Sequence, residues 1–523
     1  MRNLLFLPGV RALARWCLTA VVAVGAVGCA GGGDEGAQGS GSGGTAAVVR
    51  VPQDAPSVRR AVEMVRDGGL VLVSPGVYRE SVTVARPRVV LRGTDRNRVV
   101  IDGEFKRPNG VTVTGAGAVV ENLTVRNHLA NGVLFTGVTD ERLQAGRAGG
   151  SAYDPLDTAK FPPLHGFRAS YVTAYNNALY GIYAFDARAG VIERSYASGQ
   201  ADSGIYVGQC RPCDTVVRDN VVEHNAVGLE VTNASERLYL LGNRASRNRV
   251  GLTLNSNDLE ALGPQHGAVV AGNAFTDNND PRSPEQADGG FGIGIGSGGG
   301  RENVVERNLI TGNRAAGVVL ADVQGYPARD NTVRDNRVSG NGADLVLATG
   351  NAGGNCFVRN GEARRSPERL PGRDGCGAPA PAASSPAGRV LGAVPVVAAP
   401  AGVSFQDAPV PPAQPNLPDA PGARAGGGGA AGAGGRAGVP GAVVGDRGWS
   451  ERGSLRGLRN GRFRSHRRPC RGAAFRSFSV PWPPGDAPSH PLPRQVECHR
   501  PRVPQARGHA PYGALRVDPV RDG

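Results

Sequence analysis

Pairs of asparagines five residues apart recur along the middle of this 523-residue chain and constrain its fold more than any other feature. Glycines mark the same repeat, with spacings of 23, 24 and 23 residues from Gly181 through Gly204 and Gly228 to Gly251. A fixed period of this length indicates a solenoid of stacked structural units. The five pairs are Asn220/Asn225, Asn243/Asn248, Asn273/Asn278, Asn308/Asn313 and Asn336/Asn341.

Each repeat contains three short β-rich pieces and no helical periodicity. After the glycine, apolar residues alternate with period two, as in Ile205 and Val207 or Leu229 and Val231. Three such strands in one repeat make a triangular coil. Asparagine tolerates left-handed bends between strands, and stacked asparagines can hydrogen-bond along a column. We therefore expect the repeated asparagines to occupy the bends and to form ladders.

This repeat resembles the right-handed parallel β-helix of the pectate-lyase-like superfamily over residues 46–360. The resemblance implies an all-β solenoid and is specific for the fold, not for an activity. Residues 46–103 resemble the N-terminal cap of such proteins, with a capping helix from Ser57 to Arg66 and Ser57 as its N-cap. Asn122 and Asn127 predict that the next coil follows the same pattern.

The N-terminal residues predict export. In residues 1–29, arginines precede an apolar run that ends at Cys29, which resembles a bacterial lipobox with lipidation of the Cys29 thiol; plain secretion is the alternative. Residues 30–45 are expected to be a flexible tether. The resemblance implies a lipoprotein on the outer face of the bacterial cell membrane, which it contacts only through the lipid anchor.

The C-terminal part predicts two further segments. Residues 361–423 read as a disulfide-pinned end, with Cys356 bonded to Cys376, and an Ala/Pro-rich linker. Residues 424–523 form a low-complexity Arg/Gly/Pro-rich tail, expected to be disordered, that is either a basic tail or an out-of-frame read of a GC-rich gene. The tail carries 18 arginines and 6 acidic residues, so +12 of the total charge of +14. The near-neutral solenoid argues against a nucleic-acid partner, and we expect a monomer.

Aligning the strands places aromatic, amide and acidic side chains in one outward column through Tyr183, Tyr206 and Glu230. Exposed aromatic rings beside amides suit a polysaccharide, whose sugars offer an apolar face and hydroxyl edges; an ordinary solvated face is the alternative. The insertion at 138–164 is either a binding element or a surface loop. The predicted substrate-binding residues are Tyr183, Tyr206, Phe185, Gln209, Asn233 and Asn255.

Asp202, Glu230 and Asp186 are the candidate catalytic residues, because paired carboxylates split their pKa values and can serve in acid–base catalysis. A structural role for Asp202 in a turn is the alternative. The resemblance to polysaccharide lyases implies Ca²⁺ as a cofactor held by these acids; no other metal site is expected. It also implies a cationic base, for which the candidates are Arg168, Lys160 and His165. No catalytic motif of the family matches this chain residue by residue.

Cys210 and Cys213 form a CxxC motif in a turn between strands. A closed disulfide is expected there, because a thioredoxin-like thiolate needs a helix N-terminus and a zinc site needs a second ligand pair.

Three functions follow from these features. The first is an enzyme that processes an extracellular or cell-wall polysaccharide as a lyase, epimerase or hydrolase. The second is a non-catalytic carbohydrate-binding or structural surface protein. The third is an accessory factor resembling the periplasmic β-helix proteins of copper-site maturation, which ranks lowest because Met64 is the only methionine after Met1.

Overall fold

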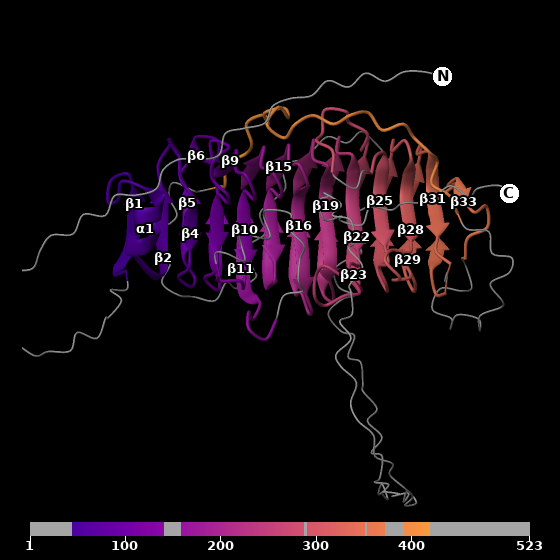
Figure 1. The fold of residues 1–523 in the computed structure, drawn as a ribbon, viewed down its shortest axis with the longest axis horizontal. Helices are drawn as coiled ribbons and strands as arrows, with labels where there is room; N and C mark the ends of the chain where they lie inside the picture. Colours follow the sequence, from indigo (N-terminus) through magenta and orange to yellow (C-terminus); the bar gives the residue numbers. More distant parts are fainter. Residues whose placement is uncertain (1–43, 141–157, 287–289, 351–352, 372–391, 419–523) are drawn as a thin grey trace, which may run out of the picture.

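The computed structural model describes residues 44–140, 158–286, 290–350, 353–371 and 392–418, and these form an elongated right-handed parallel β-helix (Figure 1). Three parallel sheets run along the solenoid, and each coil contributes one strand to each sheet. The predicted fold is therefore confirmed, with parallel pairing between strands of neighbouring coils and a register shift between Ala46 and Val48 in the first strand pair.

The 12-stranded sheet, here sheet A, has the order β1 (Ala46–Val51), β2 (Val65–Val73), β5 (Val90–Gly93), β8 (Ala118–Glu121), β11 (Leu164–Ser170), β14 (Ala187–Glu193), β17 (Thr215–Arg218), β20 (Leu238–Leu241), β23 (Ala268–Ala271), β26 (Val304–Glu306), β29 (Thr332–Arg334) and β32 (Cys356–Val358). The 10-stranded sheet B has the order β3 (Gly76–Tyr78), β6 (Val99–Asp102), β9 (Thr124–Arg126), β12 (Thr173–Tyr175), β15 (Tyr196–Ser198), β18 (Val221–Glu223), β21 (Arg244–Ser246), β24 (Ala274–Thr276), β27 (Leu309–Thr311) and β30 (Arg337–Ser339). The 11-stranded sheet C has the order β4 (Val82–Val84), β7 (Val111–Val113), β10 (Val133–Thr136), β13 (Ile182–Phe185), β16 (Ser203–Cys210), β19 (Val227–Ala234), β22 (Val250–Asn255), β25 (Ile293–Gly298), β28 (Ala316–Ala321), β31 (Ala343–Ala348) and β33 (Arg365–Ser366).

The inward-facing residues of the three sheets fill one continuous apolar core. In sheet C the pairing places Ile205 between Ile182 and Leu229 of the neighbouring coils, and all three side chains are buried. Each coil thus buries a layer of aliphatic side chains against the coils on both sides, which is how a solenoid obtains its stability.

The capping helix α1 (Val58–Met64) covers the first coils, as predicted. The Ser57 hydroxyl accepts a hydrogen bond from the Arg60 backbone N–H at 3.1 Å, so the predicted N-cap is confirmed. The carboxylate of Glu80 accepts two more of the N-terminal N–H groups, from Val58 at 3.0 Å and Arg59 at 2.9 Å. The helix ends at Met64, before the predicted Arg66, because Val65 already pairs in β2.

The repeated asparagines form two ladders that run along the solenoid, which confirms the prediction of stacking. In each ladder, the side-chain amide donates to the side-chain oxygen of the next coil at 2.9–3.1 Å, and that oxygen also accepts the backbone N–H of the preceding ladder residue. One ladder ends on Asp344 and the other on Asn360. All ten predicted ladder asparagines are buried.

The left-handed bends, in contrast, are not made by the ladder asparagines. The residue before each one adopts positive φ, for example His224 before Asn225 with φ of 56° and Arg247 before Asn248 with φ of 55°. Asn122 and Asn127 occupy this bend position themselves, with φ of 55° and 60°, so their expected place in the ladders is wrong. In that coil the ladder position belongs to the following residue, and the His128 N–H donates to the Asn177 side chain.

Residues 392–418, called the strap below, lie against the solenoid instead of forming the expected free linker. The strap runs back over sheet B from the C-terminal coils toward the N-terminal ones (orange in Figure 1). At its start Val394 and Val397 pack on the outer face of sheet C, and near its end Leu417 donates its N–H to Asn122. The proline-rich sequence of the strap does not predict that it docks on the solenoid, because proline suits a docked extended segment and a free linker equally well.

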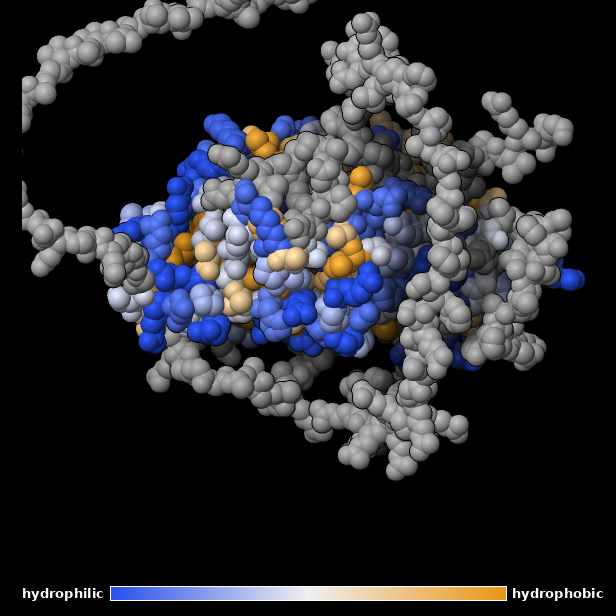
Figure 2. Space-filling model, turned by 60° about the horizontal axis from the view of Figure 1, so that its bottom comes forward, coloured by the Kyte–Doolittle hydropathy of each residue, from blue (hydrophilic) through white to orange (hydrophobic). Residues whose placement is uncertain are grey.

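Figure 2 shows a largely hydrophilic surface on the face turned forward, with only small separate hydrophobic patches. Over the ranges given above, none of the helical structure has the length and apolarity needed to cross a membrane.

Candidate functional site

The predicted outward column exists in sheet C. Tyr183 pairs with Tyr206, and Tyr206 pairs with Glu230, on the adjacent strands β13, β16 and β19. The expected exposure of this column is wrong, since Tyr183 is 4% exposed, Tyr206 0% and Glu230 2%. The reason is that chain excursions between strands fold over this part of sheet C.

The aromatic cluster, consisting of Tyr180, Tyr183, Phe185 and Tyr206, forms a small apolar core outside the solenoid. The Tyr180 ring lies 4.4 Å from that of Tyr183 and 4.7 Å from that of Tyr206, measured between ring centroids. Val138 and Phe161, from the described ends of the 138–164 insertion, pack on the cluster. The described ends of this insertion therefore cover the column.

A second excursion, residues 256–266 between β22 and β23, covers the cluster from the other side. The Tyr206 hydroxyl donates a hydrogen bond to the Glu260 carboxylate in this excursion. The side chain of Gln209 accepts the Ala261 N–H at 3.0 Å, and Asn233 donates to the Glu260 backbone carbonyl at 2.8 Å. Gln209 and Asn233, predicted to bind substrate, thus hold the excursion that buries Tyr206.

The other predicted residues lie at the ends of the same strands. Asp186 is 0% exposed, and its backbone carbonyl accepts the N–H groups of Gly137 and Leu164 at the two ends of the insertion. Asp186, Gln209 and Asn233 share a left-handed backbone, with φ of 53°, 49° and 44°. Asn255 is half-buried and bridges to Gly299.

Asp202 and Glu230, the acid pair, approach each other as predicted, because Asp202 directly precedes β16 and Glu230 lies on the adjacent β19. The Ser203 hydroxyl lies between them, at 3.2 Å from the Asp202 carboxylate and in hydrogen-bond contact with the Glu230 carboxyl group. A hydroxyl has a single proton to donate. It can therefore satisfy both carboxyl groups only if one of them is protonated.

Of the two, Glu230 is the carboxyl group whose surroundings favour the protonated form. Burial raises the pKa of Glu230 well above its ordinary value, and the negative charges of Asp202 and then Glu260 raise it further. The Thr232 hydroxyl contacts the other Glu230 oxygen at 3.3 Å. Asp202 accepts a hydrogen bond from the side-chain amide of Gln286 at 2.8 Å. The arrangement is a buried proton donor linked through Ser203 to a hydrogen-bonded acceptor.

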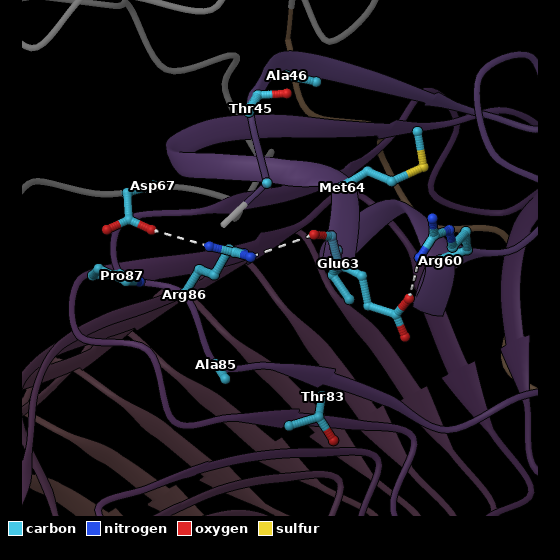
Figure 3. Close-up of a pocket in the computed structure, with 12 residues that line it drawn as sticks. Thr45, Ala46, Arg60, Glu63, Met64, Asp67, Thr83, Ala85, Arg86 and Pro87 are labelled. Carbon is cyan, nitrogen blue, oxygen red and sulfur yellow. Dashed lines mark hydrogen bonds and ion pairs between the residues drawn. The ribbon is translucent and has the colours of Figure 1, made fainter. Parts of the chain in front are cut away.

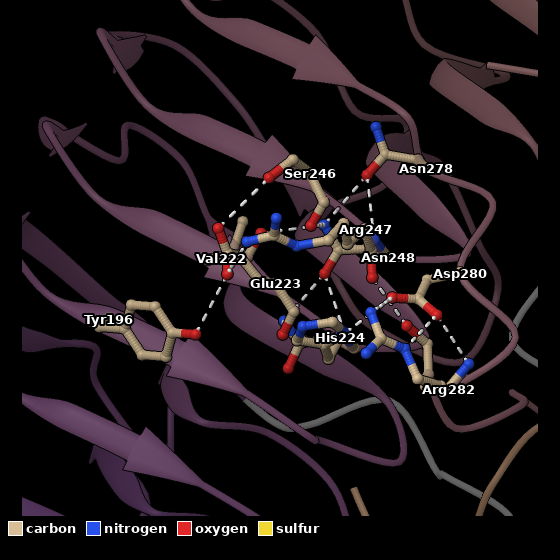
Figure 4. A network of polar contacts seen from close by, with 12 residues as sticks. Tyr196, Val222, Glu223, His224, Ser246, Arg247, Asn248, Asn278, Asp280 and Arg282 are labelled. Carbon is tan, nitrogen blue, oxygen red and sulfur yellow. Dashed lines mark hydrogen bonds and ion pairs between the residues drawn. The ribbon is translucent and has the colours of Figure 1, made fainter. Parts of the chain in front are cut away.

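The excursion between β24 and β25 supplies Gln286. Its described part, residues 277–286, is fixed by the network in Figure 4, which the sequence did not predict. Asp280 lies 2.9 Å from the His224 ring and 3.0 Å from the Arg282 guanidinium. Burial lowers the pKa of His224, although the charge of Asp280 opposes this effect. The Ser283 hydroxyl donates to the Arg247 carbonyl at 2.8 Å.

The candidate bases lie mostly elsewhere. Arg168 pairs on sheet A with the buried carboxylate of Glu193, which also binds Arg218. His165 is exposed on β11 of the same sheet. Lys160 lies 5.1 Å from the centroid of the Phe161 ring, and is therefore the only one of the three near the aromatic cluster.

The residues described here do not fit the Ca²⁺ site that the resemblance implied. Ca²⁺ takes six to eight oxygen ligands, with its carboxylates ionised, whereas burial disfavours the ionised form of Glu230 and Asp202 is engaged by Ser203 and Gln286. Within the described ranges, no group of three or more His, Cys, Asp and Glu side chains is arranged to hold a metal ion.

The Cys210–Cys213 disulfide is formed, as predicted, and both cysteines are buried. Cys356 is also disulfide-bonded, while its expected partner, Cys376, lies outside the described residues.

A cavity of about 800 Å³ lies far from the acid pair, at the N-terminal end of the solenoid (Figure 3). Its charged side chains pair with one another, since Arg60 lies 2.9 Å from Glu63 and Arg86 lies 3.8 Å from Asp67. We therefore assign the candidate site to the acid pair and the aromatic cluster.

Comparison with known proteins agrees with this architecture. The family model described as "Right handed beta helix region" matches residues 109–263, 165–331 and 262–367. No curated protein matches the chain. Among solved structures, the chain is similar to the A-module of the mannuronan C-5 epimerase AlgE4 from Azotobacter vinelandii, with a TM-score of 0.41. The two sequences are 17% identical, and the match covers 58% of this chain and 89% of that one. Carrot pectin methylesterase is 15% identical over 57% and 84% of the two chains, with a TM-score of 0.32.

Proposed function

For a chain that is a right-handed parallel β-helix, we propose an enzyme that processes an extracellular or cell-wall polysaccharide, with Glu230 as general acid and Asp202 as general base. The observation that carries this proposal is the single Ser203 hydroxyl between two buried carboxyl groups, of which Glu230 has the raised pKa. A carboxyl group with a raised pKa beside one that accepts protons is the arrangement that acid–base catalysis requires.

The reaction class follows from what the pair can exchange. Lyase, epimerase and hydrolase reactions all remove one proton and deliver another, at a sugar carbon, at a glycosidic oxygen or at water. Glu230 delivers its proton, and Asp202 takes one up, so that Ser203 can relay a proton between them and restore the starting state. Tyr206 of the aromatic cluster pairs with Glu230 on the adjacent strand, so that the buried cluster forms one wall beside the acid pair.

The cellular setting is part of the same proposal. The apolar segment before Cys29 and the small-residue stretch after it support export and lipid anchoring on the outer face of a bacterial membrane. A monomer with a polysaccharide partner and no nucleic-acid partner fits the low net charge of the residues before 424.

The non-catalytic binding alternative loses its main support. It required an open face of exposed aromatic rings, but Tyr183, Phe185 and Tyr206 are buried. A proton shared by two buried carboxyl groups has no evident use in a purely binding surface.

The test compares the wild-type chain with Glu230→Gln and Asp202→Asn on a panel of uronate-containing and neutral polysaccharides. Products are followed by unsaturated-uronate absorbance, reducing ends and the NMR spectrum of the polymer. We expect each variant to lose roughly 10²–10⁴-fold in kcat, the range of a lost general acid or base. The matched control is Glu236→Gln, which removes a half-exposed carboxylate that faces His266 instead of the acid pair and should keep the wild-type rate. Turnover by both acid-pair variants at the wild-type rate would refute these roles.

A further inference from the structure

The strap reaches the acid pair through the excursion that ends at Gln286. The Val403 N–H donates to the Ser283 carbonyl at 3.3 Å, and the Gly402 N–H donates to the Glu285 carboxylate at 3.4 Å. The next residue, Gln286, donates to Asp202 at 2.8 Å. The strap, the excursion and the general base therefore form one continuous series of contacts.

Arg249 ties the strap down beside this excursion. Its side chain is 1% exposed, and its guanidinium donates to the Pro400 carbonyl at 2.8 Å. The same guanidinium lies 5.0 Å from the Phe291 ring centroid and 3.8 Å from Glu285. Among the described residues, its Nε and Nη1 groups have no hydrogen-bond partner. The Pro400 carbonyl therefore accepts the one hydrogen bond that the buried guanidinium makes among the described residues. Release of Pro400 costs this hydrogen bond, and no second hydrogen bond of the guanidinium has to break with it.

The far end of the strap is held more firmly. Arg96 is 2% exposed and donates to the Pro415 carbonyl at 3.0 Å, while its backbone N–H donates to the Asn416 side chain at 2.6 Å. Unlike Arg249, Arg96 is also fixed by the solenoid itself, through Thr173 and the Val172 carbonyl, both at 2.8 Å. The section at residues 400–403, whose hydrogen bonds at Gly402 and Val403 are 3.4 and 3.3 Å long, is therefore the part that can leave while the far end stays bound.

We infer that the strap is a latch that keeps the 277–286 excursion closed over the acid pair, so that release of residues 400–403 frees Gln286 and opens Asp202 to substrate. This inference rests on the proposed function in one respect, which is that the acid pair is the site being covered. It explains why the candidate catalytic pair is almost fully buried.

Gly402 gives a direct way to break the latch. A Cβ atom on residue 402 would lie 2.5 Å from the Glu285 backbone nitrogen and 2.8 Å from its Cβ, so Gly402→Val must push the strap away from the excursion. The matched control is Ala401→Val, which adds bulk at the adjacent exposed position. Gly402→Ala is the milder second variant.

The measurement is amide hydrogen exchange of the full mature chain, read on peptides that cover residues 280–286, with peptides from β19 as the internal reference for folding. We expect exchange in 280–286 to be at least about 10-fold faster in Gly402→Val than in wild type, with β19 and the control variant unchanged. Equal exchange in wild type, Gly402→Val and Gly402→Ala would overturn the latch. Faster exchange in β19 of Gly402→Val would mean general unfolding, and Gly402→Ala would then decide.

Turnover separates the latch from the proposed function. On a polysaccharide that the wild type processes, we expect Gly402→Val to turn over about 10-fold faster. Faster exchange with an unchanged rate would overturn the latch as a control of the site. Faster exchange in a protein that processes no polymer in the panel would leave the latch standing as a cover and refute the function proposed for the acid pair.

Discussion

Replacing one ladder asparagine, Asn248, by alanine tests whether the ladders hold the solenoid together. Asn248 is 0% exposed. Its side-chain amide donates to the Val222 carbonyl and the Asn278 side chain, both at 3.0 Å, and its oxygen accepts the Asn225 backbone N–H at 3.1 Å and side-chain amide at 3.0 Å. The amide also donates to the Ser246 carbonyl at 3.2 Å, and alanine removes all five hydrogen bonds.

The expected cost follows from the groups left behind. The Asn225 backbone N–H loses its acceptor, and the Val222 carbonyl loses this donor, in the interior of the protein. Leaving a buried polar group unsatisfied costs about 1–3 kcal/mol, so the two groups together predict that Asn248→Ala lowers the free energy of unfolding by about 2–6 kcal/mol.

The assay is urea unfolding of the mature chain followed by circular dichroism, with m-values compared between variants. Arg244→Ala is the matched control, because Arg244 is exposed on the same coil; it should cost less than about 0.5 kcal/mol. A loss below about 1 kcal/mol in Asn248→Ala, at unchanged m-value, would show that water or a neighbouring group replaces the ladder, and the reasoning would be refuted.

Three further predictions follow from other parts of the chain. Glu230→Gln should leave the free energy of unfolding unchanged near pH 4 and raise it relative to wild type at pH 7, as measured by urea unfolding at both pH values. Burial raises the pKa of Glu230, so the wild type loses stability as the pH rises from the ordinary pKa of 4.5 toward the pKa of the folded state. Glutamine does not titrate and therefore avoids this loss. Cys29→Ala should leave unprocessed precursor, seen by mass spectrometry and membrane fractionation; a lipid-free mature wild type would contradict it. Deleting residues 424–523, which follow the strap, should change the Tm by less than about 2 °C in a thermal melt, and a drop of several degrees would mean that the tail packs on the solenoid.

The fold could be predicted from sequence because its signals are periodic. Each coil repeats the glycine, the alternating strand and the asparagine, so the register of Tyr206 with Glu230 followed from alignment of neighbouring repeats. The bend geometry was missed because Asn122 and Asn127 have the same spacing as ladder asparagines, and a shift of one residue moves a side chain from the ladder to the bend.

The cover of the site could not be predicted in the same way. The excursions that bury Tyr183 and Tyr206 break the repeat, so their sequences carry no period from which a position could be read. The strap is a further case, since Pro400 and Pro415 meet Arg249 and Arg96 through backbone carbonyls. Every residue has a backbone carbonyl, so a contact of this kind does not require a particular side chain and cannot be recognised in the sequence.

The strap also limits how this solenoid can change over evolutionary time. Repeat proteins commonly gain and lose whole units, because each unit contacts only its neighbours. Here one extended segment is attached at Arg96 and again at Arg249, which belong to coils several repeats apart. Each added coil would move these two anchors apart by about 4.8 Å, the spacing of neighbouring strands. Duplication or loss of a repeat between them would therefore require a matching change in the length of the strap, which limits the number of coils between Arg96 and Arg249.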